Sequence, residues 1–250
     1  MNLIVCVSHV PDTTSRITIA ADQKSIDPAG VKFILNPYDE YAVEEALRLR
    51  DTHKGEVTVV SVGTDAAKEA IRQALAMGAD KGILIKSEKD NSFNVAHALA
   101  ETIRPLNPDL IVCGKQSIDS DGMEVPAMLS ELLGLPAATV VVGLKIENGA
   151  AVAEKEVEGG RETISLTLPA IIAAQKGLND PRYPSLPNIM KAKQKPIQEV
   201  VLAAAPSRVT VLRMNKPDKK RANKILKVDG NAAQTASELA HLLHDEAKVI

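Results

Sequence analysis

Aromatic residues are scarce in this chain of 250 residues, which has no tryptophan, three tyrosines and two phenylalanines. Its core must therefore be built from valine, isoleucine, leucine and alanine, a composition that suits a parallel sheet covered by helices. Long apolar runs are missing too, since none approaches the roughly 20 residues that a membrane-spanning helix needs. We therefore expect no segment embedded in a membrane.

A surplus of basic charge is also absent. Lysine and arginine number 30 and aspartate and glutamate 32, which gives a formal net charge of -2 at pH 7. Broad binding of nucleic acid requires a strong positive field, so we expect no nucleic-acid partner. Hydrophobic residues make up 45% and charged residues 25%, as in an ordinary globular protein, and the length predicts one dominant core with an appendage.

Cysteine is rare, and both copies, Cys6 and Cys113, stand inside apolar runs typical of strands. Two buried, reduced thiols indicate a reducing compartment. The pattern at residues 1–5 predicts a strand. It lacks the basic flank and the cleavage site of an export signal. We expect a cytoplasmic location, or the mitochondrial matrix if the source is eukaryotic.

Strand and helix patterns alternate four times in the first half of the chain. We predict strands at residues 3–7, 56–62, 82–86 and 109–113, and helices within 31–50 and at 65–77, 92–104 and 122–133. Such alternation needs crossover connections. It predicts an α/β fold with a doubly wound, mostly parallel sheet and helices on both faces.

The helix within residues 31–50 carries clear signals for its start and its buried face. Asn36 is the expected N-cap and Pro37 the first helical residue. Glu44 and Arg48 form an i,i+4 pair that we place on the solvent side. The residues expected to face the core are Val43, Ala46 and Leu47.

Beyond residue 136 the pattern changes. Alternating runs at 139–146, 151–157 and 162–168, joined by Asn-Gly and Gly-Gly turns, predict antiparallel strands that extend or flank the sheet. Residues 177–196, which we call the arm, contain four prolines; these exclude a central strand and favour a stiff loop.

Residues 199–250 form a tail with few core signals. We predict a strand at 208–214, a basic connector at 216–227 and an amphipathic helix near 235–247. Because this tail has no core of its own, we expect it to lie on another surface.

The best candidate site is the loop at residues 114–122, which follows a predicted strand and runs into a helix. Ligands of open α/β sheets gather at the carboxyl ends of strands, and a helix N-terminus attracts phosphate. Residues 6–9 and 62–64 end strands at the same edge, and residues 36–39 would add a wall. Two alternatives stay open: Asp119 or Ser120 only caps the helix, or Asp119 and Asp121 hold a magnesium ion, because two carboxylates repel a phosphate.

Signatures of common catalytic and metal sites are absent. The first strand is not followed by G-x-G-x-x-G, and the chain has no G-x-x-x-x-G-K-[ST], G-x-S-x-G, H-E-x-x-H or paired C-x-x-C. His241 and His244 lack a third ligand, so we interpret them as surface residues. We predict no metal site and no catalytic residue.

The arm is a second candidate site. Its apolar residues Leu186, Ile189 and Met190 lie among the basic residues Lys191, Lys193 and Lys195. Burying one leucine contributes about 1.5–3 kcal/mol, which suits an anchor in a transient complex. The alternative is that these side chains fold onto the protein's own surface.

Several motifs carry a family resemblance. The stretch LNDPRYPSLPNIMKAKQK at 178–195, with EGG at 158–160 and LPA at 168–170 before it, resembles the signature of the small (beta) subunit of electron-transfer flavoproteins. The segments at 36–39, 74–80 and 114–119 resemble the nucleotide-site segments of the same family.

The resemblance implies a fold similar to the adenine-nucleotide alpha-hydrolases and a heterodimer with an alpha subunit that carries most of a redox-active FAD. It implies that this chain holds AMP and is an electron carrier rather than an enzyme. The heterodimer would accept electrons from flavin dehydrogenases, typically the acyl-CoA dehydrogenases of fatty acid oxidation, and pass them to a membrane quinone oxidoreductase.

Carried over by position, the resemblance also implies site residues and domains. Residues 1–198 would form the nucleotide-binding domain, with a recognition loop at 174–196, and residues 199–250 would pack on the alpha subunit. The residues implied to line the AMP are Cys6, Asn36, Pro37, Tyr38, Asp39, Val62, Gly114, Lys115, Gln116, Ser117, Ile118, Asp119, Ser120, Asp121, Gly122, Met123, Glu124 and Val125. Those implied to bind the dehydrogenase are Leu186, Pro187, Ile189, Met190 and Lys191.

One departure from the family pattern concerns the phosphate. Many members have a polar Asn/Thr-x-Gln-Thr/Val stretch where this chain reads GMEVP at 122–126, so backbone N–H groups replace side-chain donors. Relatives that place a second FAD here and split electron pairs tend to show D-G-D-T-A-Q-V-G-P, which is absent. That role, and an adenine-nucleotide-binding regulator resembling universal stress proteins, remain the alternatives. A third hypothesis is an enzyme that activates a carboxylate with ATP. It would need a glycine- and serine-rich loop after the first strand, which residues 8–11 do not provide.

Overall fold

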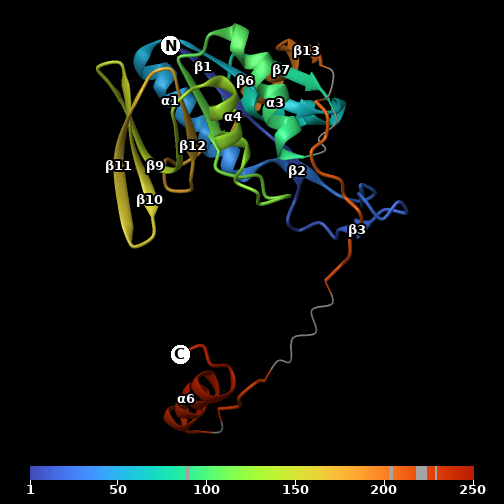
Figure 1. Cartoon of the computed structure of the whole chain (residues 1–250), viewed down its shortest axis with the longest axis vertical. Coiled ribbons are helices and arrows are strands. Elements are labelled where there is room, and N and C mark those ends of the chain that lie inside the picture. The colour runs from blue at the N-terminus through green and yellow to red at the C-terminus, as the bar shows by residue number, and fades with distance from the viewer. Residues whose placement is uncertain (88–90, 203–204, 218–223, 229) are drawn as a thin grey trace. The chain divides into compact units, whose positions relative to one another are not determined.

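The computed structural model describes residues 1–87, 91–202, 205–217, 224–228 and 230–250. These form two compact units, Met1–Arg213 and Met214–Ile250. The first unit holds a nine-stranded sheet in the order β11-β10-β9-β12-β8-β1-β6-β7-β13 (Figure 1). Its strands are β1 (Asn2–Cys6), β6 (Glu56–Gly63), β7 (Lys81–Lys86), β8 (Leu110–Gly114), β9 (Ala137–Glu147), β10 (Ala150–Val157), β11 (Gly160–Thr167), β12 (Ala170–Ala174) and β13 (Ile197–Val201).

Seven neighbouring strands, from β9 to β13, run parallel, and helices cover both faces of this part of the sheet. Alternate residues of β1 enter different cores: Leu3 and Val5 pack with helix residues such as Val43 and Ile71, whereas Ile4 packs with Leu99. The doubly wound, mostly parallel sheet is confirmed. The covering helices are α1 (Pro37–His53) and α2 (Lys68–Met77) on one face and α3 (Ser92–Ile103) and α4 (Val125–Leu133) on the other.

The antiparallel part also agrees with the prediction. Strands β9, β10 and β11 pair as consecutive hairpins, and β9 joins them to the parallel sheet through β12 (Figure 1). Asn148 and Gly149 take positive φ angles of 50° and 77°, as the turn between the first two strands requires. The buried strand β12, whose sequence is AIIAA, was not predicted.

Two helix starts differ from the prediction. Helix α4 begins at Val125 rather than at residue 122, because Asp121 and Met123 have φ angles of 52° and 54°, which a right-handed helix excludes. Residues Asp65–Ala67 form a separate 3₁₀ turn before α2. The segment between β1 and α1, where no strand was predicted, contains two small sheets, β2 (His9–Pro11) with β5 (Phe33–Leu35) and β3 (Thr18–Ile19) with β4 (Ile26–Asp27).

The arm is partly helical, so its interpretation as a stiff loop was wrong. Helix α5 (Leu186–Gln194) starts after Ser185, whose hydroxyl accepts a hydrogen bond from the backbone N–H of Asn188. Pro187 lies in the first helical turn, where its missing N–H is tolerated, and good helix formers follow. The arm then leads into β13, an edge strand that was not predicted and that carries the first unit past residue 198.

The tail differs from the prediction at its expected strand. Residues 208–214, predicted as a strand, have neither helical nor strand geometry. The predicted terminal helix is present as α6 (Ala232–His241), extended by a π-helical turn (Leu242–Glu246). Part of the predicted basic connector, residues 218–223, lies outside the described residues. No helix within the described ranges is long and apolar enough to cross a membrane.

Candidate functional site

A cavity of about 220 Å³ opens at the carboxyl edge of the parallel strands, where the sequence placed the site. The ends of β1, β6 and β8 and the N-terminal ends of α3 and α4 meet there. The residues that line it are Cys6, Val7, Ser8, Asp39, Val62, Asn91, Ser92, Val95, Leu99, Cys113, Gly114, Gln116, Ser117, Asp119, Ser120, Gly122, Met123, Glu124, Val125 and Pro126.

Twelve of the predicted ligand-binding residues therefore lie together at this cavity. They are Cys6, Asp39, Val62, Gly114, Gln116, Ser117, Asp119, Ser120, Gly122, Met123, Glu124 and Val125. The other six predicted residues do not line the cavity; they are Asn36, Pro37, Tyr38, Lys115, Ile118 and Asp121. The sequence analysis missed the lining residues from the start of α3, which are Asn91, Ser92, Val95 and Leu99. A signal was available, because β7 ends at the same edge of the sheet and a helix starts soon after it.

The cavity has an apolar floor and a polar rim. Cys6 and Cys113 are neighbours in the register of β1 and β8, and with Val62, Val95 and Leu99 they supply the floor. Hydrogen bonding to Cys113, together with burial, raises the pKa of the Cys6 thiol well above its usual range. Both thiols are free and buried, so the floor is apolar and suits a flat heteroaromatic ring.

Asp39 joins two of the loops around the cavity. Its carboxylate is 5% exposed and accepts hydrogen bonds from the backbone N–H groups of Ser8, at 2.7 Å, and Gly114, at 3.1 Å. The start of α1 thus fixes the ends of β1 and β8 against each other. This role differs from the predicted one, in which Asp39 belongs only to the wall.

Asn36 does not cap α1 through its side chain, contrary to the prediction. Its amide Nδ2 donates to the carbonyl of Gln116 at 2.9 Å, and its Oδ1 accepts from the N–H of Ile118 at 3.2 Å. The side chain is fully buried, and the loop after β8 engages both its amide nitrogen and its amide oxygen. Asn36 stands at the predicted N-cap position, but its side chain holds the loop after β8 instead of capping α1.

The loop carboxylates have partners within the loop. Gln116 Nε2 donates to Asp121 at 2.6 Å, and the Ser117 hydroxyl donates to Asp119. Across the described parts of the chain, no group of three or more His, Cys, Asp or Glu side chains is placed to hold a metal ion. The magnesium alternative for Asp119 and Asp121 therefore lacks a third ligand among these residues.

A second cavity, of about 470 Å³, lies near the amino-terminal ends of β1, β6 and β7. It is larger than the first, but its charged residues Glu56 and Lys81 form an ion pair at 2.6 Å. Ligands of this class of sheet collect at the opposite edge. We therefore assign the functional site to the cavity at the carboxyl edge.

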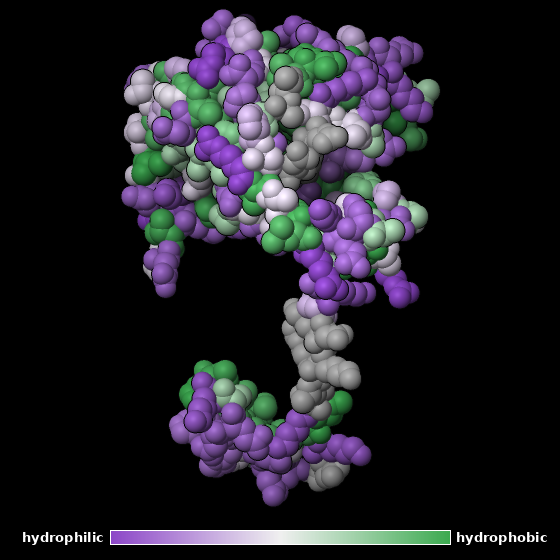
Figure 2. Space-filling model, turned by 45° about the vertical axis from the view of Figure 1, so that its right-hand side comes forward, coloured by the Kyte–Doolittle hydropathy of each residue, from purple (hydrophilic) through white to green (hydrophobic). Residues whose placement is uncertain are grey.

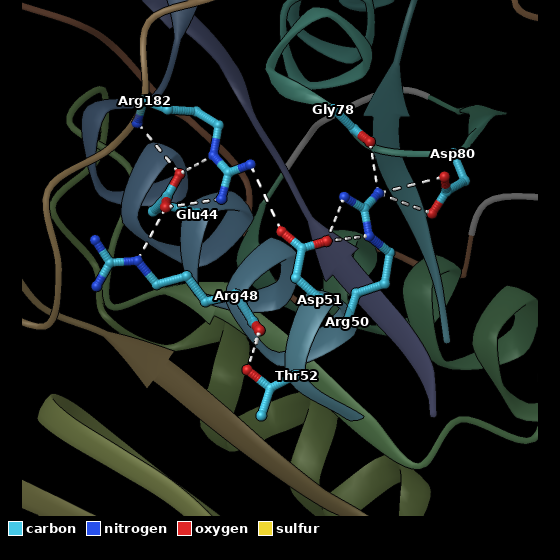
Figure 3. A network of polar contacts seen from close by, with 8 residues as sticks. All are labelled: Glu44, Arg48, Arg50, Asp51, Thr52, Gly78, Asp80 and Arg182. Atoms are coloured by element: carbon cyan, nitrogen blue, oxygen red, sulfur yellow. Dashed lines mark hydrogen bonds and ion pairs between the residues drawn. The ribbon is translucent and has the colours of Figure 1, made fainter. Parts of the chain in front are cut away.

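The base of the arm is fixed to α1 by buried carboxylates (Figure 3). The Arg182 side chain donates to Glu44 through Nε, at 2.7 Å, and Nη2, at 3.1 Å, while Arg48 Nε donates from the same helix at 2.9 Å. Glu44 is only 3% exposed, so its predicted place on the solvent side was wrong, although its pairing with Arg48 is confirmed. Next to it, Asn179 Nδ2 donates to Glu45 at 2.9 Å.

The far end of the arm is fixed to α2. Arg72 donates to the carbonyls of Ala192 and Lys195, and Lys195 donates to the carbonyl of Ala79. Ala192 is the one residue of α5 that is fully buried, and it packs into the core under α2. The other side of α5 is exposed, with Leu186 79% and Met190 60% accessible. Leu186 thus lies between the two fixed ends of the arm, at the start of α5.

The described residues of the second unit also expose apolar side chains, among them Leu239, Val249 and Ile250. Figure 2 shows green, hydrophobic surface among the purple, hydrophilic residues of this unit. His241 and His244 are exposed there and contact Asp245, in agreement with their interpretation as surface residues.

Comparison with known proteins gives a consistent result over the whole chain. A family model described as "Electron transfer flavoprotein domain" matches residues 24–205. The chain is 42% identical over 262 residues to an electron transfer flavoprotein subunit beta of Bacillus subtilis, with each chain fully covered. It is 40% identical to that of Syntrophomonas wolfei and 36% identical to that of Mus musculus, with all of this chain and 98% and 99% of theirs covered. The chain belongs to the electron transfer flavoprotein family, in which its full-length relatives are beta subunits.

Proposed function

We propose that this chain is the beta subunit of a heterodimeric electron carrier that contains FAD mainly on its alpha subunit. The carrier accepts electrons from flavin dehydrogenases, such as acyl-CoA dehydrogenases, and delivers them to a quinone oxidoreductase. This chain holds AMP and docks the dehydrogenase, and it supplies no catalytic residue. The observation that carries the proposal is the exposed Leu186 on an arm fixed at both ends, in a chain matched end to end by beta subunits.

The cavity at the carboxyl edge supports the nucleotide part of the proposal. Its apolar floor suits an adenine ring, and its polar rim suits a ribose. A volume of about 220 Å³ is below the roughly 300–1,000 Å³ of pockets that enclose a drug-sized ligand. The nucleoside therefore occupies the cavity, and the phosphate lies at the rim, where lining residues between Gln116 and Val125 border the opening.

The tail supports the heterodimer. Its described residues expose Val209, Leu212, Ile225 and Val228 besides the apolar residues of α6. A surface with this many exposed apolar side chains is costly in water and is typical of a protein interface. We assign residues 199–250 to contact with the alpha subunit. The buried free thiols Cys6 and Cys113 favour a reducing compartment, the cytoplasm or the mitochondrial matrix.

Expression together with an alpha subunit from the same source tests this function. We expect a yellow complex with one copy of each subunit, from which denaturation releases FAD and AMP in equal amounts, as measured by mass spectrometry. A colourless protein that binds an adenine nucleotide as a monomer would contradict the carrier and support a regulator of the universal-stress type. Release of two FAD per complex would favour the electron-bifurcating alternative.

The substitution Leu186→Ala tests the docking surface. It removes an apolar side chain that contacts little of its own protein, so the complex and its flavin spectrum are expected to stay intact. The KM for the carrier in the dehydrogenase reaction should rise about tenfold or more, because burying a leucine contributes about 1.5–3 kcal/mol.

The matched control is Val157→Ala, which truncates a half-exposed apolar side chain on β10. It is expected to leave the KM unchanged within a factor of two. Equal KM values for Leu186→Ala and the unmodified carrier would remove α5 from the docking surface.

A further inference from the structure

The start of α3 forms one wall of the cavity at the carboxyl edge. Its N-cap Asn91 and its first residue Ser92 line the cavity, and Val95 and Leu99 do so from the next two turns. A Cβ built on Gly122 would lie 3.7 Å from the Ser92 hydroxyl oxygen, so this wall borders the loop after β8. The position of the helix start therefore helps to set the width of the cavity.

Ser207 holds the side chain of Asn91 from a position 116 residues further along the chain. Asn91 Nδ2 donates to the Ser207 hydroxyl at 2.9 Å, while Asn91 Oδ1 accepts from the N–H of Asn94 at 3.0 Å and so caps α3. The Ser207 hydroxyl in turn donates to the carbonyl of Val209 at 2.7 Å. Because the nitrogen and the oxygen belong to one planar amide, the bond to Ser207 also orients the oxygen that caps the helix.

Arg208 makes a second contact with the same turn of α3. Its guanidinium carbon lies over the Phe93 ring, 3.8 Å from the ring centroid, which is a stacking arrangement that suits a planar cation. The Phe93 ring lies next to that of His97, with 6.1 Å between their centroids. Residues 207–209, which we call the strap, belong to the first unit and thus contact two side chains at the start of α3.

We propose that Ser207 and Arg208 are positioning residues of this cavity, which hold the start of α3 where Asn91 and Ser92 border a bound adenine nucleoside. Neither of the two lines the cavity itself, so both act through the helix. When the wall is released, part of the population cannot bind, and the affinity falls by the fraction that is lost. The inference rests on the proposed binding of an adenine nucleotide, whose failure the experiment below detects separately.

The test measures the affinity of the full-length chain, freed of nucleotide, for adenosine and for AMP by isothermal titration calorimetry. Ser207→Ala and Arg208→Ala should each weaken the binding of adenosine about threefold, and the double variant about tenfold, because an exposed hydrogen bond and an exposed cation–π contact are lost. The affinity for AMP should fall by the same factors. Hydrogen exchange over residues 91–95 should become faster in the same variants.

Two control variants separate positioning from other effects. Ser207→Thr keeps the hydroxyl group that accepts from Asn91, and it should bind adenosine within a factor of two of the unmodified chain. Arg213→Ala removes the same charge as Arg208→Ala from another exposed position of the tail, and it should alter neither affinity.

Three outcomes would overturn the inference. Unchanged affinities in the Ser207→Ala and Arg208→Ala variants, whether or not the midpoint of urea unfolding falls, would show that the strap only stabilises the fold. A loss of affinity for AMP alone would make Arg208 a phosphate ligand, and equal losses in Arg208→Ala and Arg213→Ala would reduce the effect to net charge. If the unmodified chain binds neither ligand, the proposed AMP site fails and the inference fails with it, whereas the other three outcomes leave that site standing.

Discussion

Replacing Gly114 by alanine is expected to lower the free energy of unfolding by about 3 kcal/mol, at the upper end of the range for overpacked interiors, and to abolish nucleotide binding. The added Cβ would collide with Oδ1 of Asp39 and lie 2.8 Å from the backbone carbon of Tyr38. Real Cβ atoms essentially never come this close to backbone, so β8 and α1 must separate. The hydrogen bond from Gly114 to Asp39 would then break, and the loop that borders the cavity would lose its fixed end.

Urea unfolding measures the free energy of unfolding, and calorimetric titration with adenosine measures the affinity of the cavity for this ligand. Gly122→Ala is the control in the same loop, because the nearest atoms to its Cβ lie 3.7 Å away, at ordinary van der Waals distance. It should change the free energy of unfolding by less than about 1 kcal/mol. A Gly114→Ala protein as stable as the Gly122→Ala protein would mean that α1 can move away from β8 at little cost.

Local patterns were enough to predict the layers of the fold. Runs of β-branched residues gave the parallel strands, and Gly134, with a φ of 69°, ends α4 as its type and position indicate. The edge of the sheet at which the site lies could be predicted from topology alone, because the carboxyl ends of parallel strands meet there whatever their side chains are. These features depend on neighbours in sequence or on a general rule, so one sequence suffices to predict them.

The errors concern side chains whose partners are far away in sequence. Glu44 has a polar neighbour at i,i+4 and looks like a solvent residue, but its second partner, Arg182, is 138 positions further along the chain. Asn36 has the right position for an N-cap, yet its amide meets the loop at Gln116 and Ile118. Only the tertiary structure brings such groups together, and in both cases the departure from the local rule serves a functional segment.

The cavity at the carboxyl edge of the strands and α5 lie at different places of the first unit. The cavity is bordered by α3 and α4, whereas α5 packs on α2. Both places are tied to α1, through Asp39 at the cavity and Glu44 at the base of the arm, so effects of substitutions should add where these two residues keep their contacts.

Replacing Arg182 by methionine should detach the base of the arm and lower the free energy of unfolding by about 2 kcal/mol at pH 7. Burial alone would raise the pKa of Glu44, but the hydrogen bonds from Arg182 and Arg48 hold it below the ordinary value. Without the Arg182 side chain, Arg48 is the one described side-chain donor left to the buried carboxylate, and the bond from the backbone N–H of Arg182 is lost as the base of the arm detaches. Removing one partner of a buried pair costs about 3–5 kcal/mol, and the 39% exposure of the Arg182 side chain reduces this figure.

The effect should depend on pH with a defined sign. A carboxyl whose pKa is lowered by folding adds stability above its unfolded pKa, and this stability is lost as the pH falls through the folded value. The difference between Arg182→Met and the unmodified protein should therefore be largest near neutrality and shrink in acid below the ordinary glutamate range. Urea unfolding at a series of pH values measures it, and hydrogen exchange over residues 178–194 reports release of the arm. Arg48→Met, which removes one half-exposed donor to the same carboxylate, should cost only about 0.5 kcal/mol; equal losses in the two variants, or a loss independent of pH, would contradict the role given to Arg182.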